Sequence, residues 1–157
     1  MPPMHIIQTM FEPGNLLYFN PFIFPDGGVP KPKFFVVLGE VDETLLLASL
    51  PTSKDHIPSD VEVQSGCLEI PERMVNAYTF MANEEITESG FFFDKNTFIY
   101  GQNIKTYNSA AFLNQTMSGK TVIEEKGKLK EGLFTALKDC LKSSDAVRKR
   151  YKQFLNL

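Results

Sequence analysis

Short apolar runs separated by glycine and proline dominate the first two thirds of the chain. The runs at residues 15–19, 34–38 and 44–50 are rich in Phe, Leu and Val and have the length of single strands. The run at 34–38 is unbroken, as expected of a strand that is covered on both faces. The acidic stretch at 39–43 is short enough for the strands on either side of it to pair as an antiparallel hairpin.

Weaker strand patterns continue to about residue 100. One or two strands are expected in 61–70, with a break near Ser65, and another strand in 76–81. Two aromatic runs, at 91–93 and 97–100, flank Asp94-Lys95-Asn96 and predict a second hairpin. Many short strands with frequent turns favour a mainly β fold, a small antiparallel barrel over residues 13–101, over a layered α/β fold.

The end of the chain changes to a helical period. Leucines recur every four residues from Leu129 to Leu141, which predicts a helix over 129–142. Ser143, Ser144 and Asp145 supply helix-capping chemistry, and a second apolar stripe then predicts a helix over about 144–155. One long helix through the two serines is the alternative.

The length of 157 residues and the hydrophobic content of 43% predict one domain over 1–157. We expect a barrel core at 13–101, a connecting segment at 102–127 and a C-terminal helical appendage at 128–157. The longest apolar runs are far shorter than the roughly 20 residues that cross a bilayer. The first residues show no basic region ahead of an apolar one, so we expect no signal peptide, no membrane partner and a cytoplasmic location.

The cysteines and histidines are too few and too scattered for an obvious metal centre. Cys67 and Cys140 match no zinc-ligand spacing, and a cytosolic location predicts that both are reduced, structural thiols. A cysteine nucleophile would need a histidine, and the chain has only His5 and His56. We therefore expect no metal and no cofactor.

Charge is unevenly distributed along the chain. The net charge is −3, yet residues 126–157 carry nine basic and three acidic side chains, which leaves −9 on the first 125 residues. A basic tail can contact phosphates, whereas an acidic body opposes broad adsorption to nucleic acid. The simpler interpretation is a solvated basic face on the C-terminal helices.

Residues 13–58 carry the most specific pattern, in which PGNLLYFNPFIFPDGGVPKPKFFVVL is followed by TLLLASLPTSKDHIP. The order of turn, strand, acid-Gly segment, basic-Pro step and Thr/Ser pair resembles the opening half of the MazF/PemK-like family. The resemblance covers about a third of the chain. It implies an SH3-like, CcdB/PemK-like barrel and a toxin of a type II toxin-antitoxin system, an endoribonuclease that cuts single-stranded RNA. It also implies a homodimer and an antitoxin protein as partner.

The resemblance also implies the site residues. Lys31, before Pro32, falls where the family has its catalytic Arg, and Thr52 and Ser53 fall where it has its Thr/Ser pair. Metal-free RNA cleavage needs a cation against the developing charge, hydroxyl donors and a proton acceptor, for which His56 is the candidate. Lys in place of Arg is a departure, because Lys lacks the planar fork that holds two phosphate oxygens.

Four further residues of the same two loops are candidates for RNA binding: Lys33, Asp26, Lys54 and Asp55. We expect the loops at 25–33 and 51–58 to meet on one concave surface, where the hydroxyls of Tyr18, Tyr100 and Tyr107 are also candidates. Each residue has a plainer interpretation: the lysines are solvated, Asp26 and the Thr/Ser pair form turns, and His56 lies on the surface.

Two other functions remain open from the sequence. One is a non-catalytic SH3-like barrel that binds RNA or a partner protein or peptide in the same groove. The other is a protein-interaction module without RNA, in which the acidic body is the functional surface.

Overall fold

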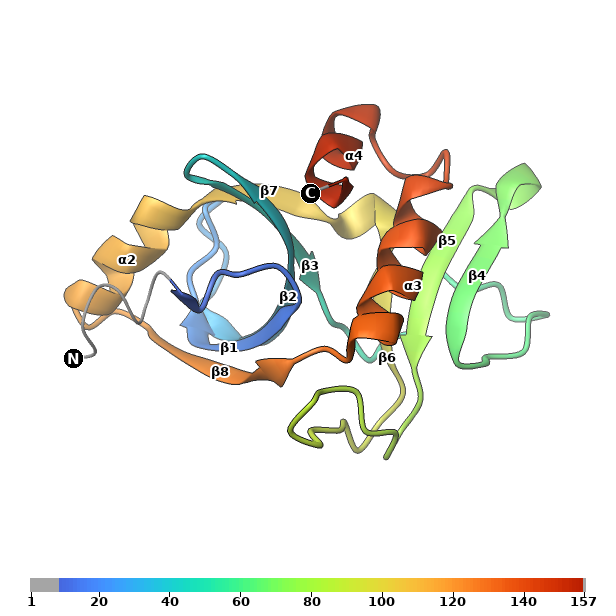
Figure 1. Ribbon diagram of the computed structural model, residues 1–157, viewed down its shortest axis with the longest axis horizontal. Helices are drawn as coiled ribbons and strands as arrows, with labels where there is room; N and C mark the ends of the chain where they lie inside the picture. The colour runs from blue at the N-terminus through green and yellow to red at the C-terminus, as the bar shows by residue number, and fades with distance from the viewer. Residues whose placement is uncertain (1–8, 157) are drawn as a thin grey trace.

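The computed structural model describes residues 9–156, which form two antiparallel sheets and three helices (Figure 1). The larger sheet has the order β7-β3-β2-β1-β8 and the smaller one the order β4-β5-β6. The strands of the larger sheet are β1 (Asn15–Phe22), β2 (Lys31–Val41), β3 (Thr44–Ser49), β7 (Lys105–Asn108) and β8 (Val122–Lys128). The smaller sheet contains β4 (Gly66–Ile70), β5 (Val75–Phe80) and β6 (Thr97–Tyr100). Two 3-10 turns, η1 (Pro71–Arg73) and η2 (Gly101–Asn103), and the helices α2 (Ser109–Met117), α3 (Glu131–Lys142) and α4 (Lys149–Leu155) complete the fold.

The mainly β class is confirmed, but the described residues form no closed barrel over 13–101. The larger sheet is open, with β7 and β8 at its edges, and the strands between residues 66 and 100 pair only with one another. β7 and all but the last residue of β8 come from 102–127, the segment that was expected only to connect barrel and helices. That segment also contains α2, whose first amides are capped by the Asn108 side chain.

The predicted hairpin of two central strands is confirmed. β2 and β3 pair antiparallel and turn at Asp42 and Glu43. The predicted strand at 91–93 is wrong: the three phenylalanines lie in a loop, in which the Ile86 amide donates to the Phe91 carbonyl. The Phe91 and Phe93 rings lie 5.9 and 5.1 Å from the Phe34 ring, so they cover β2 without extending a sheet.

The two predicted C-terminal helices are separate, but the second begins at Lys149 and not near residue 144. Ser143 ends α3, and Arg148, which precedes α4, makes no side-chain capping bond. Ser144 is fully buried between them, and its hydroxyl accepts from the Ala146 amide at 3.1 Å. Leu137 and Leu141 of α3 and Phe154 and Leu155 of α4 belong to the largest core cluster. Because α3 packs on β4 and β5 while α4 packs on β2, the helices join the two sheets and are no appendage.

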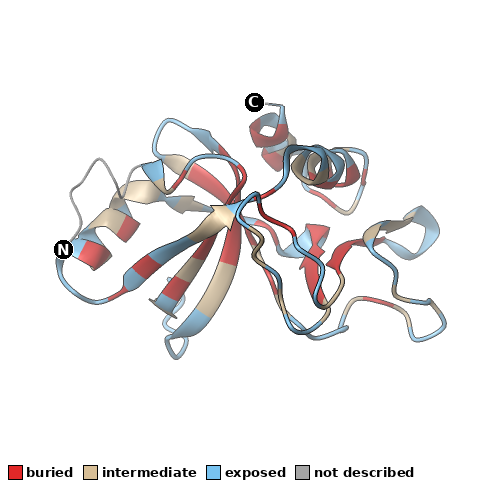
Figure 2. Cartoon of the chain, turned by 60° about the horizontal axis from the view of Figure 1, so that its bottom comes forward, coloured by how far each residue is buried: buried red, intermediate tan, exposed pale blue. Residues whose placement is uncertain are grey.

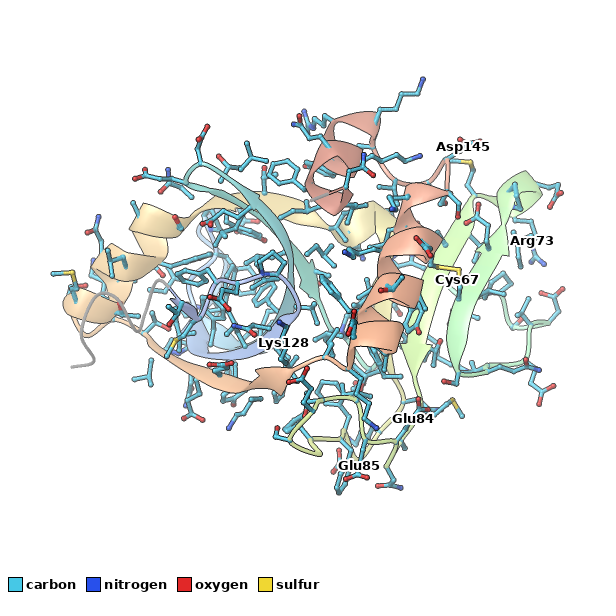
Figure 3. The ribbon with its side chains drawn as sticks, in the orientation of Figure 1. Cys67, Arg73, Glu84, Glu85, Lys128 and Asp145 are labelled. Atoms are coloured by element: carbon cyan, nitrogen blue, oxygen red, sulfur yellow. A yellow bond between two sulfur atoms is a disulfide. The ribbon has the colours of Figure 1, made fainter. Side chains whose placement is uncertain are left out.

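A disulfide joins Cys67 of β4 to Cys140 of α3 (Figure 3). The prediction of two reduced thiols, which rested on an expected cytoplasmic location, is therefore wrong. The two residues are 73 positions apart, with Cα atoms 5.7 Å from one another. This distance is typical of disulfides. Sequence spacing gave no sign of the pairing, because only the docking of α3 on the small sheet brings the two residues together.

A second core cluster lies on the other face of the larger sheet and is mainly aromatic. Phe19, Phe22 and Phe35 come from β1 and β2, and Phe112 of α2 covers them. Buried residues are concentrated where the sheets and helices face one another, while the outer loops and turns are exposed (Figure 2). Within residues 9–156, no helix has the length and apolar character needed to span a membrane. His5 lies outside the described residues.

Candidate functional site

Strand register gathers three lysines at one end of the aromatic sheet face. Lys31, Lys33 and Phe35 alternate along β2 and therefore point to the same face. Phe35 is paired with Ser49 of β3, and Leu47 of β3 is paired with Lys105 of β7. Directly paired residues of antiparallel strands share a face. Lys105 therefore lies on the same face of the sheet as Lys31 and Lys33.

Lys33, Phe35, Ser49 and Lys105 line a cavity of about 230 Å³, which we call the lysine pocket. Its lining consists of Phe22, Phe24, Lys33, Phe35, Ser49, Asn103, Lys105 and Tyr107. Lys31 lies beside it, with its ammonium 5.8 Å from the centre of the Phe24 ring. The Lys33 ammonium lies 5.4 Å from the Phe24 ring and 5.6 Å from the Phe35 ring. The pocket thus combines cations with aromatic walls.

The positive charges in the pocket are not neutralised by the residues that the structure describes. The ion pairs within residues 9–156 involve Arg73, Lys126 and Lys142, and none involves a pocket lysine. Burial lowers the pKa of Lys33, and repulsion from Lys31 and Lys105 lowers it further. Keeping Lys33 protonated in the folded chain therefore costs free energy, and a bound anion would offset this cost.

This cost predicts a pH-dependent stability difference. Because the pKa of Lys33 is lower in the folded than in the unfolded chain, the unfolded chain binds more protons between the two pKa values, and stability gains from rising pH. We expect Lys33→Met to be more stable than the wild type at neutral pH, with the advantage vanishing as the pH rises towards 10.5, the ordinary lysine pKa. Urea unfolding at a series of pH values measures this. Lys95→Met, at an exposed loop position, is the control and should show no such trend.

Basic residues at the start of α4 surround Tyr151 on the other side of β7. Burial raises the pKa of Tyr151, but the adjacent Arg150 and Arg148 guanidiniums and the Thr106 hydroxyl outweigh it and leave that pKa lowered. The Arg150 guanidinium lies 3.3 Å from the Tyr151 hydroxyl. Burial raises the pKa of Tyr107, and Tyr151 and Asp26 raise it further. Thr106 and Tyr107 are neighbours on β7 and point to opposite faces of the sheet, so the basic residues at the start of α4 lie across β7 from the lysine pocket.

The Thr/Ser loop lies along the small sheet. Its strand neighbour is β6, because the Phe98 amide donates to the Pro51 carbonyl at 2.9 Å. The Tyr100 hydroxyl donates to the Ser53 carbonyl at 2.7 Å. Thr52 and Ser53 are exposed, and neither lines the lysine pocket. The structure therefore places Lys31 and Lys33 together at the pocket, whereas the Thr52 and Ser53 hydroxyls do not line it.

His56 lies in a separate, open groove of about 500 Å³. Its Nδ1 atom lies 3.1 Å from the Gln102 side-chain nitrogen, and its ring meets the Tyr100 ring edge-on at 4.8 Å. Asp55 and Arg73 also line this groove. The groove and the lysine pocket meet at η2, where Gln102 lines the groove and Asn103 lines the pocket.

The other two predicted RNA-binding residues, Asp26 and Lys54, lie in different loops. The Asp26 carboxylate accepts from the Gly28 amide at 3.0 Å, which is the turn role, and it also acts on Tyr107 of the pocket. Lys54 is exposed in the Thr/Ser loop.

Sequence reasoning missed Lys105, Ser49 and Asn103. Lys105 and Tyr107 alternate within KTYN, a two-residue period that was the available signal for an edge strand. Ser49 ends the predicted strand at 44–50, but only the β2–β3 register shows that it lies beside Phe35.

No group of three or more His, Cys, Asp or Glu side chains within residues 9–156 is arranged to hold a metal ion. Comparison of the chain with protein-family models, with curated proteins and with solved structures finds no match.

Proposed function

We propose that this chain binds single-stranded RNA, with phosphates held in the lysine pocket. The observation that carries the proposal is the convergence of Lys31, Lys33 and Lys105, without carboxylate partners among the described residues, on an aromatic-walled cavity. Lysines neutralise phosphates, and exposed aromatic rings stack on unpaired bases. Phe24 and Tyr107 are the rings available for stacking.

The experiment compares RNA affinity at several salt concentrations, using fluorescence anisotropy of a labelled single-stranded RNA of about twelve nucleotides. Removing three phosphate contacts should reduce the slope of log affinity against log salt by about 2, at roughly 0.7 per contact for single strands. The variant is Lys31→Ala combined with Lys33→Ala and Lys105→Ala. At physiological salt we expect it to bind more than about tenfold more weakly than the wild type.

A matched triple variant controls for net charge. Lys95→Ala, Lys120→Ala and Lys130→Ala remove the same charge from exposed positions that do not line the pocket. If both triple variants lose affinity and salt slope equally, binding reflects overall charge and the pocket proposal is wrong.

Toxin-like endoribonuclease activity is the second candidate. It is favoured by Lys31, which lies beside the pocket at the position that the MazF/PemK resemblance gives to the catalytic cation. The same proposal includes an SH3-like fold for the larger sheet. Incubation with single-stranded RNA without added metal tests it: Lys31→Arg should retain or raise cleavage, and Lys31→Ala should lower it. Absence of cleavage across a broad panel of RNAs, with intact binding, would leave the binding function alone.

A further inference from the structure

Lys33 occupies a different environment from the exposed lysines of this chain. It is half-buried on β2, and its ammonium contacts two aromatic rings, at 5.4 Å from Phe24 and 5.6 Å from Phe35. By contrast, Lys31 and Lys105 are exposed at the edge of the same cavity. Lys33 is therefore the inner amine of the lysine pocket, and the other two lie between it and solvent.

The charges around Lys33 favour its neutral form. Burial, then Lys31 from the same strand, then Lys105 from β7, all lower its pKa. Asp26 in the loop between β1 and β2 is the carboxylate that acts on this pocket, and its influence falls on the Tyr107 hydroxyl. A lysine that is desolvated and placed next to other cations is the usual arrangement for a nucleophilic amine, because only the unprotonated amine carries a free electron pair.

The pocket also suits a small anionic ligand. Its volume of about 230 Å³ has room for a single ring or a short phosphorylated chain. Lys31 and Lys105 offer cations to the anionic group, while Ser49, Asn103 and Tyr107 offer hydrogen bonds. An anion bound by the two outer lysines would hold the rest of the ligand against Lys33.

We propose that Lys33 is a reactive amine that forms an imine with a phosphate-bearing aldehyde bound in the lysine pocket. The neutral Nζ attacks the carbonyl carbon, and a proton passes from nitrogen to oxygen to give a carbinolamine. Loss of one water molecule then forms the C=N bond, so the step needs no oxidant or reductant. This chemistry uses the same pocket as the proposed RNA site but does not depend on RNA binding.

Pyridoxal 5′-phosphate is a suitable probe, because it joins an aldehyde, an aromatic ring and a phosphate. The full chain is incubated with it at neutral pH, the imine is trapped with cyanoborohydride, which spares disulfides, and peptide mass mapping locates the label. We expect Lys33 to be labelled several-fold faster than the exposed Lys95. Pyridoxal without phosphate should react more slowly at Lys33, since the outer lysines then have no anion to bind.

Three variants sharpen the test. Lys33→Arg should abolish the fast labelling, and Lys105→Gln should slow it and move its pH profile to higher pH, because one repelling cation is gone. Lys95→Gln is the control and should leave Lys33 labelling unchanged. Labelling spread over exposed lysines at similar rates, or a Lys33→Arg chain labelled as fast as the wild type, would overturn the proposal. RNA binding by the wild type without preferential labelling of Lys33 would overturn the imine proposal alone, whereas preferential labelling of Lys33 without RNA binding would overturn the RNA proposal alone.

Discussion

Replacing Gly39 with alanine is expected to lower the free energy of unfolding by about 2 to 3 kcal/mol, the upper part of the range for overpacked positions. Gly39 lies in β2 beneath α4, and a Cβ atom there would overlap the Phe154 carbonyl oxygen and lie 3.0 Å from its carbonyl carbon. Backbone cannot rotate away as a flexible side chain can. The added methyl group must therefore push α4 off the sheet, and Phe154 and Leu155 leave the core with it.

Gly132→Ala is the matched control in the same protein. Gly132 lies in the first turn of α3, and a Cβ atom there would meet no other atom within 4 Å. Alanine should stabilise that helix by up to about 1 kcal/mol, since glycine is the poorer helix former. Urea unfolding of both variants gives the two free energies. A Gly39→Ala chain as stable as the wild type would mean that α4 does not pack on β2 in this way.

The parts of the fold that the sequence predicts are those determined by neighbouring residues. The β2–β3 hairpin follows from two apolar runs separated by a short acidic turn, and α3 and α4 follow from two apolar stripes, although α4 begins at Lys149 and not at the predicted 144. In each case the pattern that predicts the element lies within the element itself and the turn beside it. Local patterning also misleads at 91–93, where three consecutive phenylalanines indicate a strand but form a loop that covers Phe34.

What the sequence cannot predict is pairing between distant segments. Lys105 enters the pocket because β7 pairs with β3, although about 60 residues separate the two strands along the chain. Alternation within KTYN identifies a short strand without identifying its partner. Lys31 and Lys33, by contrast, could be selected from their place in the loop and strand that carry the family resemblance. Two of the three lysines could therefore be selected from the sequence, whereas the third could be assigned to the site only from the sheet topology.

The same limit applies to the Thr/Ser loop. Its polar residues after a buried strand indicate an exposed turn, which the structure contains, but its direction depends on the small sheet. Because the Phe98 amide of β6 binds the Pro51 carbonyl and Tyr100 binds the Ser53 carbonyl, the loop is held along the small sheet, and its His56 lines a groove with Gln102. No spacing within the chain distinguishes this direction from the expected one.

Breaking the Cys67–Cys140 disulfide is expected to destabilise the protein by about 2 to 4 kcal/mol, because the bond closes a long loop in the unfolded chain. The bond connects positions 73 residues apart and ties β4, an edge strand of the small sheet, to α3. Its removal leaves α3 held to that sheet by apolar packing and by the Asn76 side-chain amide, which donates to the Cys140 carbonyl at 3.2 Å. Urea unfolding with and without a phosphine reductant measures the loss.

Cys67→Ser supplies the control, because Cys67 is exposed whereas Cys140 is buried, so serine at 67 removes the bond with little change in packing. This variant should match the reduced wild type in stability and should not respond to reductant. Two free thiols in the native, unreduced protein would contradict the prediction. Because the lysine pocket is built from the larger sheet, the β1–β2 loop and η2, the bond lies outside it. Under reducing conditions that leave the chain folded, RNA affinity and Lys33 labelling should therefore persist while stability falls.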